Sequence, residues 1–234
     1  MTSVMLPNLK ALSLSFCVLL STYTTYLGGT PPNPTPYNST NPDSMGFVVT
    51  PRALFIRRFI NVSQGIYYAY LCLVYPSPPS LTCPHPSQLS PDVFAWTPYS
   101  IICIATILLG CYIRLSAFSA LGSDFTFRLA APKKFVTSGL YSYVQHPSYI
   151  GKALVVFGNM ALFQNPYGPV GCWLPAWAVE AKLFWRAAAC LFVLGIGRVT
   201  WKRVKEEEMM LKDTFGKEWE VWHAKTKRFV PAVF

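Results

Sequence analysis

About five long apolar stretches divide the chain, each close to the length that an α-helix needs to cross a bilayer. They cover residues 9–27, 53–75, 99–118, 147–163 and 183–200. A helix satisfies its own backbone hydrogen bonds in lipid, so this pattern predicts an all-α, polytopic integral membrane protein. The first stretch has a short apolar core followed by polar residues, and a cleaved signal peptide is the alternative interpretation there.

The connections between these stretches differ in character. Residues 28–51 and 76–98 are rich in Pro and predict irregular loops. The first contains Asn38-Ser39-Thr40, a glycosylation pattern that matters only if this loop is lumenal. Residues 167–180 are apolar but interrupted by Pro, and we expect a short re-entrant or interfacial segment. The charged residues after 200 predict a cytoplasmic amphipathic helix.

Charge sets the expected orientation, because Lys and Arg are enriched in cytoplasmic loops. The loop 76–98 has neither residue, whereas the connection 119–146 contains Arg128, Lys133 and Lys134 and the C-terminal tail contains the most. We therefore expect a lumenal N-terminus and a cytoplasmic C-terminus. The connection 119–146 and the tail should share one side of the membrane.

Composition supports a protein partly solvated by lipid. Hydrophobic residues make up 52% and charged residues 13%, about half the charged fraction of a soluble domain. This excludes disorder for the chain as a whole. The net charge is +10, but the basic residues gather near the C-terminal end, which argues against a nucleic-acid partner. The 7 cysteines contain no CxxC pair, so we expect small packed side chains, without a disulfide framework or metal site.

The first segment with candidate chemistry precedes the fourth apolar stretch. A Thr137-Ser138-Gly139 turn leads to Tyr141 and then to His146-Pro147-Ser148-Tyr149. Proline suits the first position of a helix, so His146 should lie at a helix start on the membrane surface. Taken alone, such a histidine is more often a cap or a surface residue than a ligand-binding group.

The second segment follows the fifth stretch. Arg203 and Glu207 are four residues apart and would share one helix face. Leu211, Phe215, Trp219 and Trp222 continue a helical stripe that would hold the tail against the membrane or the other helices. The alternative is a charged juxtamembrane helix that binds anionic lipid.

Together the two segments resemble the isoprenylcysteine carboxyl methyltransferase family of membrane enzymes. The resemblance covers roughly residues 120–234. It is carried by Gly139-Leu140-Tyr141, by His146-Pro147-Ser148-Tyr149-Ile150-Gly151, by Asn165-Pro166, and by Arg203, Glu207, Glu208, Leu211, Phe215 and Gly216. It implies N-terminal transmembrane helices with Pro-rich loops over 1–118 and a methyltransferase core over 119–234. Two positions depart from the family: Gln145 stands where Arg is frequent, and Trp219 where Tyr is usual.

The resemblance further implies S-adenosylmethionine as cofactor, C-terminally prenylated proteins as substrates and the endoplasmic reticulum membrane as location. Methylation of the prenylcysteine carboxylate would occur at the membrane surface, in a pocket closed by the tail. Arg203 and Glu207 would be the catalytic pair, with Arg203 contacting the substrate and Glu207 the cofactor. The other cofactor-binding residues would be Lys133, Lys134, Phe135, Val136, Tyr141, His146, Pro147, Ser148 and Tyr149.

These residue types suit that reaction. A terminal carboxylate is ionised at neutral pH, so the site needs no general base and has only to align the reactants and exclude water. The planar fork of Arg203 can hold a carboxylate. Three alternatives remain open: a phospholipid or small-molecule N-methyltransferase, an NADPH-dependent sterol-type reductase with a related His-Pro-x-Tyr stretch, and a non-enzymatic membrane adaptor.

Overall fold

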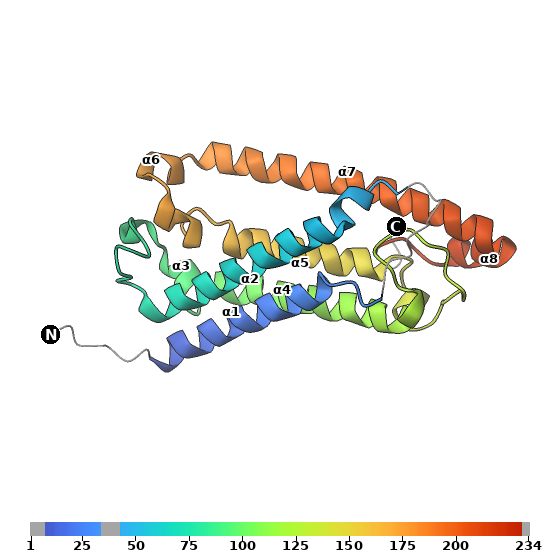
Figure 1. Ribbon diagram of the computed structural model, residues 1–234, viewed down its shortest axis with the longest axis horizontal. Helices are drawn as coiled ribbons and strands as arrows, with labels where there is room; N and C mark the ends of the chain where they lie inside the picture. The colour runs from blue at the N-terminus through green and yellow to red at the C-terminus, as the bar shows by residue number, and fades with distance from the viewer. Residues whose placement is uncertain (1–7, 34–42, 231–234) are drawn as a thin grey trace. The chain divides into compact units, whose positions relative to one another are not determined.

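A computed structural model describes residues 8–33 and 43–230, and within them helices are joined by loops with no β-strand (Figure 1). Long helices occupy all the predicted positions: α1 (Leu9–Gly28), α2 (Pro51–Val74), α4 (Pro98–Leu121), α5 (Pro147–Phe163) and α7 (Lys182–Phe215). The all-α class is therefore confirmed. The predicted glycosylation pattern at Asn38 lies outside the described residues.

Three of the described helices are long and apolar enough to cross a membrane: α1, α7, and α4 with the short 3₁₀ helix η3 (Gly122–Asp124) that extends it. The membrane character of the chain is thus confirmed. Helix α2 carries Arg52, Arg57 and Arg58, and α5 has only 17 residues. The number of about five spans stays a prediction.

Helix α7 shows most clearly why lipid is required. No residue in its apolar window is buried, and Leu191 and Leu194 are 71% and 68% exposed. A continuous apolar surface of this kind is costly in water. The sequence predicted an end near residue 200, but α7 continues without a break to Phe215 (Figure 1). Residues 201–215 contain neither Gly nor Pro and are rich in helix-forming Lys, Glu, Met and Leu.

Gly216 ends α7. Its φ of 54° is a backbone conformation that residues other than glycine rarely adopt. A short helix, α8 (Lys217–Lys225), follows. The prediction of one continuous helical stripe from Leu211 to Trp222 is therefore wrong: its first half lies on α7 and its second half on α8. The C-terminal helix itself is confirmed.

The described chain divides into two compact units, each built from three segments. Unit 1 comprises Met1–Tyr26, Arg58–Leu109 and Leu154–Ala188, and unit 2 comprises Leu27–Arg57, Gly110–Ala153 and Ala189–Phe234.

The core of unit 1 is built around Tyr68. Its fully buried ring packs edge-on against Phe94 and Phe163, and its hydroxyl donates a 2.6 Å hydrogen bond to the Val93 carbonyl. Helices pack closely in this unit where a small residue stands at the crossing: a Cβ on Gly65 would lie 2.1 Å from the Thr22 hydroxyl. Such small-residue contacts are typical of helix pairs in lipid.

Two loops of unit 1 are joined covalently by a disulfide between Cys83 and Cys172. The His85 amide donates to the Cys172 carbonyl at 3.2 Å, and the Ser90 amide donates to the Tyr167 carbonyl at 3.0 Å. The prediction that these two cysteines are reduced packing residues is therefore wrong. The sequence separation of 89 residues concealed a proximity that only the fold creates.

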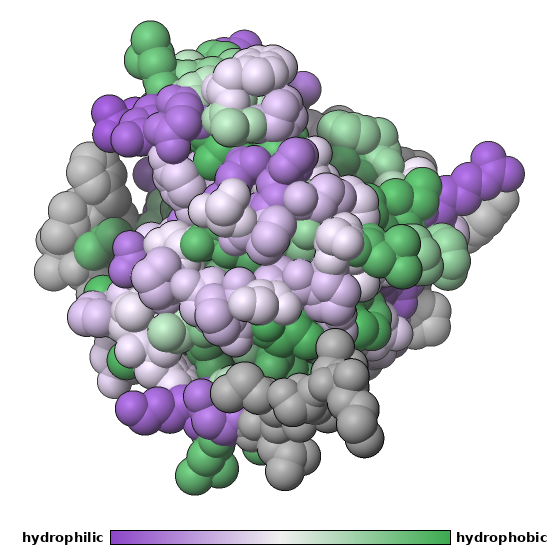
Figure 2. Space-filling model, turned by 90° about the vertical axis from the view of Figure 1, so that its left-hand side faces the viewer, coloured by the Kyte–Doolittle hydropathy of each residue, from purple (hydrophilic) through white to green (hydrophobic). Residues whose placement is uncertain are grey.

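Residues 167–180 form two short elements, the 3₁₀ helix η5 (Pro169–Trp173) and α6 (Ala176–Val179). Both are far shorter than a membrane-spanning helix, which confirms the prediction of a short segment here. Figure 2 views the side of the molecule that carries these loops, where pale, weakly polar residues gather.

Candidate functional site

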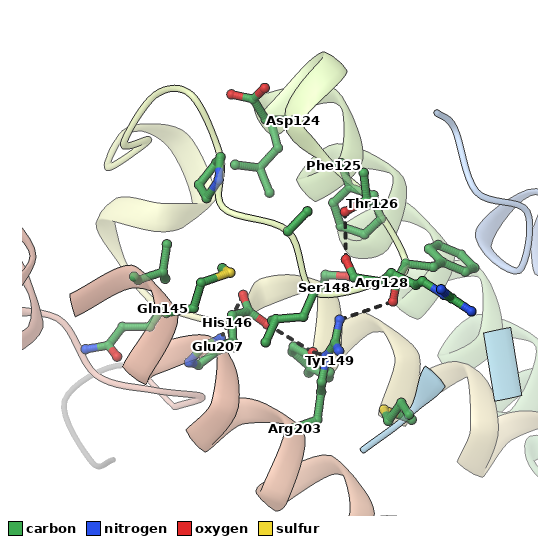
Figure 3. Close-up of a pocket in the computed structure, with 18 of the residues that line it drawn as sticks. Asp124, Phe125, Thr126, Arg128, Gln145, His146, Ser148, Tyr149, Arg203 and Glu207 are labelled. Atoms are coloured by element: carbon green, nitrogen blue, oxygen red, sulfur yellow. Dashed lines mark hydrogen bonds and ion pairs between the residues drawn. The ribbon is translucent and has the colours of Figure 1, made fainter. Parts of the chain in front are cut away.

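Unit 2 contains a pocket of about 1160 Å³, including space open to solvent. Its walls come from the 3₁₀ helix η1 (Gly46–Val49) and its flanks, the C-terminal part of α4, residues 124–136, the start of α5, α7 and Trp222 of α8 (Figure 3).

The C-terminal tail pairs with the residues that lead into α5, two of which, Gln145 and His146, line this pocket. Val144 and Lys227 form a parallel bridge, and the amides of Gln145 and His146 donate to the carbonyls of Lys227 and Arg228 at 2.8 and 3.1 Å. The Gln145 side-chain amide donates to the Thr226 carbonyl, and its oxygen lies 2.9 Å from His223 Nδ1. Gln145 therefore fastens the tail with both ends of its amide.

His146 is buried between two acidic residues of α7. Its Nδ1 lies 3.7 Å from Glu207 Oε1 and its Nε2 lies 3.6 Å from Glu208 Oε1, distances longer than a hydrogen bond. Burial lowers the pKa of His146, but its interactions with Glu207 and Glu208 outweigh burial and raise the pKa above its ordinary value. The ring thus favours the imidazolium form, held by charge on both sides.

The two segments that the sequence singled out meet at Tyr149. Its hydroxyl donates a 3.0 Å hydrogen bond to Glu207 Oε2, and Arg203 Nε donates to the same hydroxyl at 3.3 Å (Figure 3). Arg203 and Glu207 share one face of α7, as their spacing predicted. The expected meeting of the His-Pro segment with the acidic segment is confirmed.

Arg203 is engaged at each of its three nitrogens. Nη2 donates to the Phe127 carbonyl at 3.1 Å, and Nη1 forms a close ion pair with Asp43. The Asp43 carboxylate also accepts from the amides of Met45 and Leu129, at 2.9 and 3.1 Å. The side chains of Arg203 and Asp43 are 5% and 9% exposed, so this is a buried ion pair.

Most of the predicted site residues line this pocket: Lys134, Phe135, Val136, Tyr141, His146, Ser148, Tyr149, Arg203 and Glu207. Lys133 and Pro147 do not line it. The Lys133 amide binds Asp124 at 3.0 Å, and Pro147 is fully buried at the first position of α5.

An aromatic wall covers the end of the pocket near α8. Phe135 stacks on Phe215 with ring centroids 4.9 Å apart and meets Trp222 edge-on at 5.1 Å. Trp222 in turn donates through Nε1 to the Tyr141 carbonyl at 3.2 Å. Burial, reinforced by the charge of Glu207, raises the pKa of Tyr141, so its hydroxyl stays neutral.

Sequence reasoning missed three charged residues that line the pocket, Arg57, Arg114 and Lys152, and it also missed Asp43, which pairs with the pocket residue Arg203. Arg114 donates to the Gly28 carbonyl at 2.6 Å and to the Ser148 hydroxyl at 2.9 Å. Asp43 lies in a Pro-rich loop and belongs to no motif. Lys152 could have been found, since it lies three and four residues after two motif residues and shares their helix face.

The sequence of the chain is similar to a known protein family. The model of the isoprenylcysteine carboxyl methyltransferase (ICMT) family matches residues 102–186. The predicted resemblance is confirmed. The matched stretch includes the His-Pro motif but ends before Arg203.

Curated relatives carry related names. The chain is 29% identical over 151 residues to a protein-S-isoprenylcysteine O-methyltransferase of Xenopus laevis, covering 63% of this chain and 46% of the relative. It is 26% identical over 144 residues to the Schizosaccharomyces pombe protein of that name, covering 60% and 52%. The chain therefore spans about half the length of these relatives.

Proposed function

We propose that this chain is an S-adenosylmethionine-dependent methyltransferase that esterifies the C-terminal carboxylate of S-prenylated cysteine in proteins, at the membrane surface. The observation that carries the proposal is the Tyr149–Glu207–Arg203 contact, which unites both family motifs in one pocket. The family match and the names of the relatives support the same reaction.

The residues of the pocket fit the cofactor. Glu207 is 29% exposed although it is paired, so its carboxylate remains accessible to a cationic ligand. His146 lies beside one oxygen of that carboxylate, and Tyr149 donates a hydrogen bond to the other. Phe135 and Trp222 offer aromatic faces, which attract cations and stack on nucleobases. Glu207 would hold the cationic part of S-adenosylmethionine, and the aromatic wall would hold its apolar and ring portions.

Bound S-adenosylmethionine supplies an electrophilic methyl group, whose bond to sulfur breaks with the electron pair remaining on sulfur as the carboxylate oxygen bonds to the carbon. The substrate carboxylate is already ionised at neutral pH, so the protein has no proton to remove. Its residues act by alignment and by excluding water, effects that reach roughly 7–11 kcal/mol in ideal cases. The tail, bound at Gln145 and His146, would help to hold these pocket residues in place.

We further propose the endoplasmic reticulum membrane as the location, with the C-terminus in the cytoplasm. The Cys83–Cys172 disulfide supports a lumenal position for the loops that carry it, because disulfides persist in oxidising compartments. The cationic residues of 119–146 and of the tail support the cytoplasmic side for those segments.

The decisive experiment is methyl transfer from radiolabelled S-adenosylmethionine to N-acetyl-S-farnesylcysteine, using the full chain in membranes. We expect methylation of the free acid. Methylation of phosphatidylethanolamine alone would instead indicate the N-methyltransferase alternative. Binding of NADPH without any binding of S-adenosylmethionine would indicate a reductase.

Glu207→Gln tests the assigned cofactor contact. Removing the charge should weaken S-adenosylmethionine binding at least tenfold, or about 1.4 kcal/mol, measured by equilibrium dialysis. Glu220→Gln is the matched control, because Glu220 is exposed and pairs with Lys212 on the surface. Equal affinities of the Glu207→Gln variant and the unmodified protein would contradict the role of Glu207.

A further inference from the structure

Arg203 was expected to bind the substrate carboxylate, but its nitrogens are engaged by Tyr149, Phe127 and Asp43. A substrate carboxylate would have to displace the buried Asp43 to reach it. Separating a buried ion pair in this way costs several kcal/mol. The geometry points instead to Lys152 as the residue that binds the substrate carboxylate, with Arg203 as a positioning residue. This inference rests on the proposed function and names the recognition group of the same pocket.

The face of α5 that lines the pocket includes Lys152. Ser148 and Tyr149 precede it by four and three residues, and all three line the pocket. The rotation of α5 is fixed by Gly151, where an added Cβ would lie 2.6 Å from the Gly110 carbonyl oxygen and 2.8 Å from the Arg114 nitrogen. With the backbone of α4 so close at Gly151, α5 cannot rotate to turn Lys152 away from the pocket.

The charge environment of Lys152 indicates an anionic ligand. Its electrostatic neighbours are Arg57, Arg114 and Arg203. The structure records no hydrogen bond or ion pair for the Lys152 side chain with any described residue. Like charges repel one another, so these neighbours disfavour the charged ammonium of Lys152. Nothing in the fold accounts for this placement, whereas one bound carboxylate would compensate it.

The other cations of this cluster already have partners. Arg57 donates to the Gly29 carbonyl at 2.9 Å, and Arg114 binds Gly28 and Ser148. These two arginines raise the positive potential of the pocket, but their guanidinium groups are already hydrogen-bonded. A single terminal carboxylate is therefore the ligand class that the cluster recognises, and an uncharged ester is not. This property would also favour release of the methylated product.

Lys152→Met tests the inference, because methionine keeps the side-chain length and removes the charge. We expect at least a tenfold rise in KM for the farnesylcysteine acid and an unchanged affinity for S-adenosylmethionine. The ratio of acid to methyl-ester binding, measured by calorimetry in detergent, should fall by a similar factor. Lys152→Arg should retain this preference for the acid, and Lys217→Met on exposed α8 is the matched control.

Several outcomes would overturn the inference. Unchanged acid binding in Lys152→Met is one, and equal weakening of acid and ester, the mark of a structural role, is another. Loss of acid preference in Arg203→Ala but not in Lys152→Met would return the contact to Arg203. Lys152→Gln replaces the methionine variant if the latter does not fold. Absence of methyl transfer by the unmodified protein would refute the proposed function, while the acid-to-ester binding ratio would still test Lys152.

Discussion

His146 shows how one residue of this protein joins burial to charge. It lies between Glu207 and Glu208, and these carboxylates raise its pKa despite burial. A pKa that is higher in the folded state stabilises that state fully below the unfolded value, about 6.5. The contribution is lost as the pH rises through the higher folded value.

We therefore expect the thermal unfolding temperature of the protein in detergent to fall as the pH rises above about 6.5. His146→Gln should flatten this part of the profile, because glutamine carries no proton that is lost in this range. His223→Gln is the control, since the pKa of His223 is lowered, chiefly by burial. A profile of His146→Gln as steep as that of the unmodified protein would contradict the charged clamp.

The residues of the site differ in how far the sequence revealed them. His146, Tyr149, Arg203 and Glu207 lie in motifs with fixed spacing, and a helix turns such spacing directly into a shared face. Asp43 lies in a loop without periodicity, so its position depends on a contact 160 residues along the chain (203 − 43). Sequence patterns carry no signal for such a long-range ion pair.

At the scale of elements, the segment after the first helix is bound to α7 through buried charge. Asp43 pairs with Arg203, and the Ser44 amide donates to Glu206 at 2.9 Å. The described end of the Pro-rich loop, residues 43–50, thus lies at the wall of the pocket. Its acidic residue neutralises the guanidinium that orients Tyr149.

Asp43→Asn should destabilise the protein by about 3 kcal/mol, because it leaves the buried Arg203 charge without its carboxylate. The measurement is chemical unfolding in detergent, followed by fluorescence. Asp213→Asn, at an exposed position of α7, should change stability little. The double variant Asp43→Asn/Arg203→Gln should be less destabilised than the sum of its single variants, and simple additivity would count against the pair.

The helices themselves were largely predictable, and their ends were not. The apolar stretches of the sequence predicted the positions of α1, α2, α4, α5 and α7. Most of the helix ends lie within a few residues of the predicted ones. The length of α7 was missed because hydropathy ends at residue 200 while helix propensity continues to Phe215. Hydropathy predicts the apolar part of a helix that lies in lipid. It does not predict where the helix ends, because a helix can continue into water.

At the scale of the whole molecule, the disulfide and the distribution of charge bear on which side of the membrane each loop occupies. Cys83 and Cys172 lie in loops without a cationic cluster, and their bond requires an oxidising compartment. Lys133 and Lys134 lie in the connection that would be cytoplasmic in the proposed orientation. The disulfide and the charged residues are independent arguments for the same orientation. Each can be tested at its own position in the chain.

In sealed microsomes, an impermeant maleimide should not modify Cys83 or Cys172, even after reduction with a membrane-permeant reagent. Modification should appear only when the membrane is also permeabilised with a denaturing detergent, because both side chains are fully buried in the fold; it is detected by a mass shift on gels. Cys83→Ser should leave Cys172 reactive in permeabilised vesicles without reduction, and Cys190→Ser is the control because Cys190 is a free thiol. Trypsin added outside the vesicles should cleave at Lys133 and Lys134. Labelling of Cys83 in sealed vesicles would reverse the orientation, since it would place the loop on the cytoplasmic side, where a stable disulfide does not persist.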